Sequence, residues 1–449
     1  MKVLWVINVM LPAYAVAKKQ PHTVREGWIS GLYEQVRRNA DTAVQEGITL
    51  GICFPAKRNT GREVIDGVTF YGFREDLNAP EKYDRALEKR FAKIVEDFRP
   101  DIAHVFGTEF PHALAFVHAF EQPERTLIGI QGICTEIAKE YRAGLPDNVW
   151  MRTTFRDAVR RDSLRQQQEK FRVRGVRERS ALLLAAHITG RTDFDREFVR
   201  RLCPRATYYQ MNETMRAPFY EGEWSLQHAT PHSMFLAQAD YPLKGLHFVL
   251  RAMPYLISRY PDLHLYIAGN TLFDSASAEK ENDHAVHGAK KSIRKKVPED
   301  LKVGAYGEYL SQLAGTALLE EHITFLGVLD AEAMRNAYLR AHVVLCPSVL
   351  ENSPNSVCEA MLLGVPVVAS DTGGIPSLLS DRREGLLFKK TSVRELQSAV
   401  QAVFDDDALA ESLGAAARRR ALVTHDPGAN FRRLCEIYRE ITEQQPDII

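Results

Sequence analysis

Residues 343–389 read VVLCPSVLENSPNSVCEAMLLGVPVVASDTGGIPSLLSDRREGLLFK, and this stretch predicts one βαβ unit. The apolar run Val343 to Cys346 is typical of a buried strand. Ser353 to Glu359 opens a helix, and Gly364 stands where a C-terminal cap belongs. A second apolar run, Pro366 to Ala369, predicts the next strand, which ends in the loop Asp371-Thr372-Gly373-Gly374. Because ligands of open α/β sheets bind beyond the carboxyl ends of the strands, we expect both loops to face a binding cleft.

Two carboxylates frame this unit, Glu351 in the first loop and Glu359 within the helix, eight positions apart. Ionised carboxylates are good acceptors for the vicinal hydroxyls of a sugar. The backbone N–H groups at the helix N-terminus between them suit a phosphate. Sugar hydroxyls and phosphate together describe a nucleotide sugar. The alternative is that Glu351 is a solvated loop acid and Glu359 a residue of the helix surface.

The same residues resemble a known family. Glu351-x7-Glu359, Ala360-Met361, the run Gly364 to Ser370 and Gly373-Gly374 are similar to the signature of the family-4 retaining glycosyltransferases. The resemblance is strongest over residues 230–425. It implies the GT-B fold, in which two Rossmann-like domains face each other across a cleft. It also implies an activated-sugar donor bound mainly by the C-terminal domain.

The composition is that of an ordinary α/β protein. With 449 residues the chain is long enough for two domains, each with its own core. It has 58 Lys and Arg against 58 Asp and Glu, so its net charge favours no particular partner, and no nucleic acid is expected. The six cysteines are scattered without a Cys-x-x-Cys motif. This pattern indicates buried free thiols in a reducing compartment rather than disulfides or a zinc site.

The N-terminus also bears on where the protein works. MKVLWVINVMLP predicts the first strand rather than a signal peptide, since no small-residue cleavage site follows it. No stretch approaches 18 continuous apolar residues. We therefore expect a cytoplasmic protein. If its acceptor is a lipid-linked saccharide of surface polysaccharide assembly, we expect peripheral contact with the inner face of the membrane.

Strand-like runs alternate with helical patterns along the chain, which favours two doubly wound parallel sheets. We predict an N-terminal domain over 1–215 and a C-terminal domain over 230–426, joined where Pro218, Gly222 and Pro231 interrupt periodicity. Pro427 to Ile441 reads as an amphipathic helix, and the resemblance implies that 427–449 packs back on the first domain. The predicted strands are Val3–Asn8, Ile48–Phe54, Ile102–Phe106, Thr126–Ile130, Ala186–Gly190, Ser233–Gln238, Leu263–Ala268, Ile323–Leu326, Val343–Cys346, Pro366–Ala369 and Gly385–Phe388.

After the first strand we expect a loop from Pro12 to Glu26, followed by Gly27. The resemblance implies that this region approaches the donor diphosphate, and a glycine lets backbone come close to an anion. The alternative is an ordinary transition from loop to helix. No G-x-G-x-x-G follows this strand, which disfavours a dinucleotide oxidoreductase.

Other strand ends of the first half supply further polar residues. Glu109 and His112 follow the third strand and could bind an acceptor hydroxyl or assist proton movement, or could simply cap a helix. Gln131 follows the fourth strand, where many family members carry histidine. It keeps a donor and an acceptor but cannot act as a base at neutral pH. Arg191 follows the fifth strand and could face the cleft.

In the second half, Lys244 matches a family position that clamps the donor diphosphate, and lysine is a suitable point charge for phosphate. Gln238 replaces the arginine that usually stands six positions earlier. Asn270 follows a strand where the family places contacts to the nucleotide base. The remaining expected donor-binding residues are Ser353, Pro354, Asn355 and Ser356 at the helix start and Gly373 and Gly374 in the following loop.

Residues 151–179 form a basic helical stretch, with ten Lys and Arg against four Asp and Glu. It is either a solvated helix face or a surface that attracts anionic lipid heads or a pyrophosphate-linked acceptor. Residues 271–320 are polar and locally basic around 290–296, which indicates an exposed helical insertion.

These observations predict a retaining glycosyltransferase that moves a hexose-type unit from a nucleoside diphosphate sugar, most simply a UDP-sugar, to a hydroxyl of a saccharide or lipid-linked saccharide. The resemblance implies a front-face displacement, in which the departing phosphate helps to take the acceptor proton. Lys244, Glu351, Glu109 and His112 are the expected catalytic residues, with Glu351 at the sugar ring and Glu359 at the ribose hydroxyls. No cofactor and no divalent metal is expected. A sugar-nucleotide epimerase or phosphorylase of the same fold, and a non-catalytic sugar-nucleotide-binding subunit, remain open alternatives.

Overall fold

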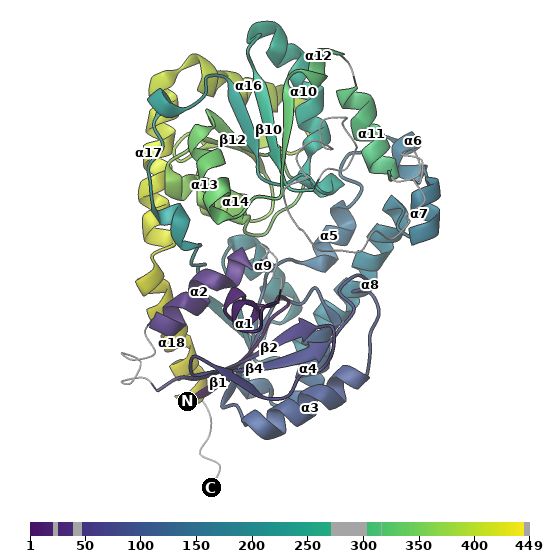
Figure 1. The fold of residues 1–449 in the computed structure, drawn as a ribbon, viewed down its shortest axis with the longest axis vertical. Coiled ribbons are helices and arrows are strands. Elements are labelled where there is room, and N and C mark those ends of the chain that lie inside the picture. The colour runs from purple at the N-terminus through teal and green to yellow at the C-terminus, as the bar shows by residue number, and fades with distance from the viewer. Residues whose placement is uncertain (21–25, 39–46, 271–302, 316, 444–449) are drawn as a thin grey trace.

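The computed structural model describes residues 1–20, 26–38, 47–270, 303–315 and 317–443. Within them the chain forms two lobes, one above the other in Figure 1, each built on its own sheet. The first sheet has eight strands in the order β3-β4-β2-β1-β5-β6-β7-β8, and the second has six in the order β11-β10-β9-β12-β13-β14. Every strand pairing is parallel except that of β3 with β4.

The strand bounds confirm all the predicted strands, with ends shifted by two residues or fewer. The strands are β1 Lys2–Val6, β2 Thr49–Ala56, β3 Glu63–Ile65, β4 Val68–Arg74, β5 Ile102–Phe106, β6 Thr126–Gly129, β7 His187–Gly190, β8 Thr207–Gln210, β9 Ser233–Leu236, β10 His264–Ala268, β11 Ile323–Gly327, β12 Val343–Cys346, β13 Val367–Asp371 and β14 Leu386–Lys389.

Helices cover both faces of each sheet, so the strands can be apolar on both sides. The helices of the first half are α1 Pro12–Ala17, α2 Gly27–Arg38, α3 Ala86–Phe98, α4 Pro111–Phe120, α5 Cys134–Glu140, α6 Asp147–Met151, α7 Phe155–Arg160, α8 Leu164–Leu183 and α9 Asp193–Leu202. Those of the second half are α10 Leu246–Arg259, α11 Ala305–Ala314, α12 Ala317–Glu320, α13 Ala331–Arg340, α14 Asn355–Leu363, α15 Ile375–Leu378, α16 Val393–Asp405, α17 Asp407–Thr424 and α18 Pro427–Glu443.

Three strands were not predicted: β3, β4 and the short edge strand β8. β3 and β4 form an antiparallel hairpin whose two-residue turn is Asp66-Gly67, with φ of 47° and 78°. Positive φ at both turn positions is the geometry that matches the twist of a hairpin, and Asp-Gly favours it. The Asp-Gly pair between two β-rich runs is therefore the sequence signal for this hairpin.

The last helix crosses from the second lobe to the first, as the yellow ribbon shows in Figure 1. In the first core, Trp5 Nε1 donates to Tyr438 Oη of α18 at 2.9 Å. Tyr438 Oη also lies 2.9 Å from His104 Nδ1. Burial lowers the pKa of His104 to about 3, so its ring is neutral and Nδ1 can accept from the tyrosine. These buried polar contacts, among fully covered apolar side chains, hold α18 against the first sheet.

The prediction of a loop from Pro12 to Glu26 is wrong for its first part. Pro12–Ala17 form helix α1, with the proline at the first helical position. Most of the insertion predicted over residues 271–320 lies outside the described residues. Within its described part, Ala305–Ala314 form helix α11. The six cysteines are all buried and unpaired, as predicted.

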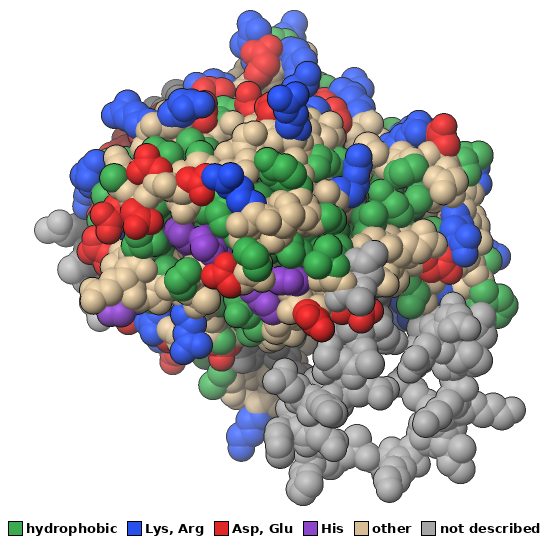
Figure 2. All heavy atoms as spheres, turned by 90° about the horizontal axis from the view of Figure 1, so that it is seen from above, with side chains coloured by type: hydrophobic (Ala, Val, Ile, Leu, Met, Phe, Trp, Pro, Cys, Tyr) green, Lys and Arg blue, Asp and Glu red, His purple; other side chains and the backbone are tan. Residues whose placement is uncertain are grey.

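Among the residues that the structure describes, no helix is long and apolar enough to cross a membrane. Figure 2 shows one face of the second lobe, on which basic, acidic and hydrophobic side chains are mixed.

Candidate active site

A cavity of about 470 Å³ lies between the two domains. Its wall on the first domain comes from residues just past the ends of β1, β5, β6 and β7 and from α2, α5, α8 and α9. Its wall on the second domain comes from the loops after β9 and β12 and the start of α14. Of the residues that sequence predicts for the site, the lining includes Glu109, Gln131, Arg191, Gln238, Lys244, Glu351, Ser353, Pro354 and Asn355.

Lys244 and Glu351 meet at this cavity as an ion pair, with Nζ 2.7 Å from Oε1. Ser348 Oγ donates to the same carboxylate oxygen at 2.7 Å. The segment that carries Lys244 can pack this closely against the loop after β12 only because residue 245 is a glycine. A Cβ at Gly245 would lie 2.0 Å from the Pro347 carbonyl oxygen. Burial alone would lower the pKa of Lys244, but the Glu351 carboxylate raises it above its usual value, so the lysine stays charged.

The amino end of α14 opens beside this pair. Pro354 is the N-cap residue and no side chain caps the helix. The first N–H groups of a helix have no partner within it and attract anions. Lys244 and this helix end together make the second-domain wall suitable for a diphosphate.

Asn352, which the sequence analysis missed, connects the two domains. Its Nδ2 donates to the Gln131 carbonyl at 3.1 Å, and its Oδ1 accepts from Thr192 Oγ1 at 3.0 Å. Nearby, the Asp193 N–H donates to Ser377 Oγ at 3.0 Å. The loop that carries Glu351 is therefore fixed against the first domain by its next residue.

Gly373 and Gly374 do not line the cavity, contrary to the expected direct contact with the donor. A Cβ at Gly373, where φ is 53°, would lie 2.0 Å from the Glu351 carbonyl oxygen. A Cβ at Gly374 would lie 1.9 Å from the Asn352 carbonyl oxygen, and the Gly374 N–H donates to the Glu351 carbonyl at 2.9 Å. The two glycines instead let β13 support the loop that carries Glu351.

Glu359 and Gly27 also lie away from the cavity lining. They meet around Arg216, whose Nη2 donates to Glu359 Oε1 at 2.8 Å. Tyr338 Oη donates to the other carboxylate oxygen at 3.3 Å. A Cβ at Gly27 would lie 3.0 Å from Arg216 Nε, so the glycine makes room for the guanidinium. Burial raises the pKa of Glu359, against the opposing effect of Arg216.

Glu109 lies on the first-domain wall. Its Oε1 accepts from the Gly132 N–H at 2.6 Å, while Oε2 has no hydrogen-bond partner among the described residues. Gly107 leaves the space that the carboxyl occupies, since a Cβ there would lie 2.4 Å from Oε2. Burial raises the pKa of Glu109, so the neutral acid is favoured more than in water.

His112 is not brought to the cavity. Its side chain is 1% exposed, with Nδ1 2.6 Å from Glu75 Oε2. It lies in the first turn of α4, which turns it inward beneath the helix. Asn270 is exposed just past the end of β10. Ser356 lies one residue beyond the lining, and its carbonyl oxygen is 3.2 Å from Tyr338 Oη.

Arg191 and Gln238 line the cavity from opposite domains. Arg191 Nη2 lies 2.7 Å from Glu213 Oε1, and both side chains are nearly covered. Burial raises the pKa of Glu213 to about 7, against the effect of Arg191. The Arg191 side chain is therefore engaged by a buried glutamate within the protein.

The sequence analysis also missed the aromatic part of the lining. Trp28, Phe171 and Tyr241 contribute rings to the cavity, and Arg174 lies beside Phe171. Aromatic faces are apolar surfaces on which the C–H faces of sugars can rest.

Among the described residues no group of three or more His, Cys, Asp or Glu side chains could hold a metal ion.

Comparisons with known proteins give the family that part of this chain resembles. Residues 225–420 match the family model described as "Glycosyl transferases group 1". A curated D-inositol 3-phosphate glycosyltransferase of Arthrobacter is 26% identical over 198 residues, 44% of this chain and 39% of the relative. A GDP-mannose-dependent alpha-(1-6)-phosphatidylinositol monomannoside mannosyltransferase of Mycolicibacterium smegmatis is 27% identical over 203 residues, 44% of each chain. The chain thus matches about two fifths of the length of these relatives.

Solved structures match over nearly the whole chain. Sucrose-phosphate synthase from Thermosynechococcus elongatus has a TM-score of 0.65 at 15% identity, covering 99% of this chain and 100% of its own. HepE of Anabaena, solved in complex with UDP-glucose, has a TM-score of 0.61 at 15% identity, covering 98% of this chain and 100% of its own. These likenesses confirm the predicted GT-B fold.

Proposed function

We propose that the chain, whose residues 225–420 match the group 1 glycosyl transferases, is an enzyme of the family-4 type. It moves a sugar from a nucleoside diphosphate donor to an acceptor hydroxyl, with retention of anomeric configuration. The observation that carries this proposal is the pairing of Lys244 with Glu351 beside the uncapped end of α14, on the wall of an interdomain cavity. A cation and a helix N-terminus suit the diphosphate, and the carboxylate suits hydroxyls of the transferred sugar.

In this proposal the second domain stabilises the leaving group. The bond between the anomeric carbon and the diphosphate oxygen breaks, and negative charge develops on that oxygen. Lys244 Nζ and the first N–H groups of α14 oppose that charge where it forms. The acceptor hydroxyl attacks from the same face, and its proton passes to the departing phosphate.

We assign the acceptor to the first-domain wall, with Glu109 as a hydrogen-bond partner for its hydroxyl. Oε2 of Glu109 has no partner among the described residues, so it can accept that hydrogen bond. His112 has its Nδ1 bound to Glu75 and lies away from the cavity, which favours a structural role for it.

A nucleotide panel tests this function. Thermal unfolding is measured with UDP, GDP and ADP, and with their glucose conjugates. UDP is the first choice, because HepE was solved with UDP-glucose. A ligand at a hundred times its dissociation constant adds about 2.7 kcal/mol of stability. We expect one base to stabilise the protein well beyond the others. No stabilisation by any nucleotide or conjugate would contradict the proposal.

Transfer is expected to survive an excess of chelator. A cation held by carboxylates at the diphosphate would need ligands that the described cavity lining does not gather, since Glu351 is already paired with Lys244. The measurement is transfer rate or donor hydrolysis before and after EDTA. Complete loss of rate, restored by magnesium or manganese, would overturn this prediction.

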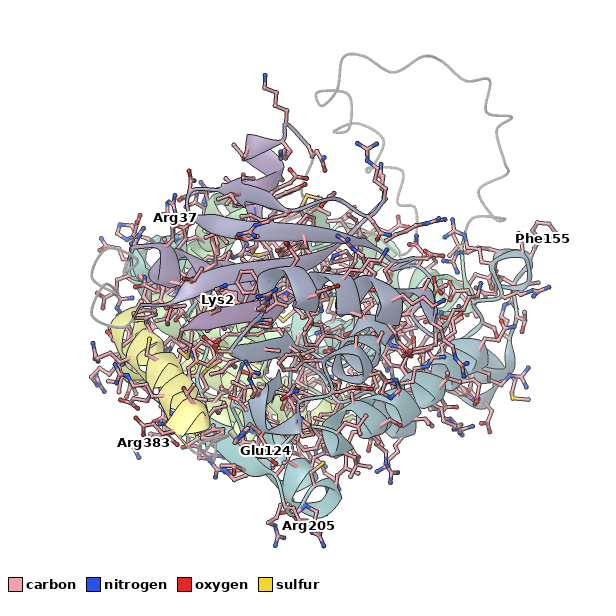
Figure 3. The ribbon with its side chains drawn as sticks, turned by 90° about the horizontal axis from the view of Figure 1, so that it is seen from below. Lys2, Arg37, Glu124, Phe155, Arg205 and Arg383 are labelled. Carbon is pink, nitrogen blue, oxygen red and sulfur yellow. The ribbon has the colours of Figure 1, made fainter. Side chains whose placement is uncertain are left out.

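We further propose that the acceptor is a saccharide or a lipid-linked saccharide, the latter reached by peripheral contact with an anionic membrane. The mannosyltransferase relative is named for a phosphatidylinositol acceptor. In this chain α7 exposes Phe155 and Val159, which are 63% and 67% accessible. Figure 3 shows Phe155 at the outer edge of the molecule, far from α18 in that view. Exposed apolar side chains beside the exposed Arg160 and Arg161 suit a lipid surface.

Vesicle flotation tests this contact. Binding to anionic but not neutral vesicles is expected, at about 1 kcal/mol for each basic residue that reaches the surface. Changing Arg160, Arg161 and Arg165 to Glu should abolish it. Arg156 is left unchanged because it is paired with Asp157 and Asp162, at 3.1 and 3.4 Å. The control removes the same number of basic charges elsewhere by changing Arg200, Arg201 and Arg205 to Glu; Arg200 and Arg201 pair with Glu197 in the protein. Equal loss in both variants, or indifference to lipid charge, would contradict the contact.

A further inference from the structure

Three cationic side chains line the cavity, and they differ in how their charge is balanced. Lys244 is paired with Glu351, and Arg191 is paired with Glu213. Arg174 forms no ion pair with any carboxylate that the structure describes. A cation in a partly covered site without an opposite charge is costly, and a ligand can supply that charge.

Arg174 is held in place on α8. Its Nε donates to the Glu109 carbonyl oxygen at 2.8 Å. Its guanidinium carbon lies 4.4 Å from the centre of the Phe171 ring and 5.6 Å from that of Phe110. Contact with the rings and the fixed Nε bond orient the planar guanidinium, so that less freedom is lost when it binds a ligand.

Glu109, whose carbonyl oxygen accepts from Arg174, makes no ion pair with it through its carboxyl group. One carboxylate oxygen of Glu109 accepts from the Gly132 N–H, and burial raises the pKa of this carboxyl against the opposing effect of Arg174. Among the described residues of the first-domain wall, the Arg174 guanidinium is therefore a cation without an ion-pair partner.

Arg174 lies on the opposite domain from the groups proposed to hold the donor diphosphate. Lys244 and the start of α14 belong to the second domain, whereas Arg174 shares the first-domain wall with Trp28 and Phe171. Aromatic rings suit a sugar, and a guanidinium suits phosphate or carboxylate, which it can bind through two parallel hydrogen bonds.

We propose that Arg174 binds a negatively charged group of the acceptor, a phosphate or a carboxylate, and so selects an anionic saccharide or lipid-linked acceptor over a neutral one. This inference rests on the proposed transfer function and names the acceptor class for the same site. The anion belongs either to the sugar, as in a sugar phosphate or uronate, or to the lipid phosphate that carries it.

The test measures equilibrium binding to the full chain saturated with UDP. The sugar arm compares glucose 6-phosphate and glucuronate with glucose, and the lipid arm compares hexyl phosphate with hexanol. Wild type is expected to prefer the anionic probe by about tenfold or more in at least one arm, as a charged hydrogen bond implies. The arm that shows the preference identifies the source of the anion.

Variants then assign that preference to the residue. Arg174→Gln should reduce the preference for the anionic over the neutral probe to about twofold or less, while UDP affinity is kept. Arg174→Lys should retain part of that preference. Arg179→Gln removes the same charge from an exposed position of α8, and this variant should keep the full preference for the anionic probe. The inference is overturned if neither arm shows a preference, if both glutamine variants behave alike, or if Arg174→Gln weakens UDP binding instead. Absence of UDP binding by wild type would refute the proposed UDP donor, which separates that failure from this one.

Discussion

Lys244→Ala is expected to lower transfer about a hundredfold while the protein stays folded. A preorganised donor aimed at charge that develops in a transition state is worth about 3 kcal/mol. The Lys244 ammonium group contacts Glu351 at the cavity, and the two side chains are only 14% and 13% exposed. After the change, Ser348 Oγ still donates to Glu351 Oε1, so the carboxylate keeps one partner. The measurement is single-turnover transfer together with a thermal unfolding curve.

A second lysine of the same domain provides the control for that variant. Lys390 also pairs with a glutamate, since its Nζ lies 3.0 Å from Glu140 Oε1, but that pair is exposed and far less constrained. Lys390→Ala should leave transfer near wild type, because exposed ion pairs contribute little. Activity of Lys244→Ala within threefold of wild type, or equal losses in the two variants, would remove Lys244 from the leaving-group role.

The sequence was most informative where function follows from local pattern. The βαβ unit around Glu351 has a buried apolar strand, a short helix and a glycine at the helix end with φ of 78°, and each has a local signal. The same logic placed Glu109, Gln131 and Arg191 at the cavity, because the carboxyl ends of parallel strands share one edge of the sheet.

Contacts between distant segments were not predictable in the same way. Gly27 and Glu359 carry the expected residue types, but both are organised around Arg216, which no pattern connected to either of them. His112 follows a strand end as Glu109 does, yet the first turn of α4 directs it to Glu75. Spacing identifies the edge of the sheet from which a side chain starts, and tertiary packing decides where that side chain points.

The glycine pair after β13 shows the same limit. A resemblance to a family marks Gly373 and Gly374 as important but does not say what they touch. The structure gives a steric reason, since each glycine lies against a backbone carbonyl of the Glu351 loop. In the structure the two glycines support that loop and do not line the cavity.

Gly374→Ala is therefore expected to destabilise the protein and to disrupt the site. The new Cβ would lie 1.9 Å from the Asn352 carbonyl oxygen and 2.6 Å from Thr192 Cγ2, so backbone must move. Overpacking of this kind costs about 1–3 kcal/mol or more. Because Asn352 holds the Gln131 carbonyl across the cleft, displacement of its loop should move Glu351 and weaken the contact between the domains. Both thermal stability and transfer should fall.

Gly61→Ala is the matched control, because a Cβ at Gly61 would meet nothing within 4 Å. It should leave stability and transfer near those of wild type. In the Gly374→Ala background, Thr192→Ser removes the methyl group that the new Cβ would meet and keeps the hydroxyl that accepts from the Asp195 N–H. This second change should restore only part of the stability, since the clash with the Asn352 carbonyl remains. Equal stability of Gly374→Ala and Gly61→Ala would show that the loop can move away without cost, and would refute its role as a fixed support for Glu351.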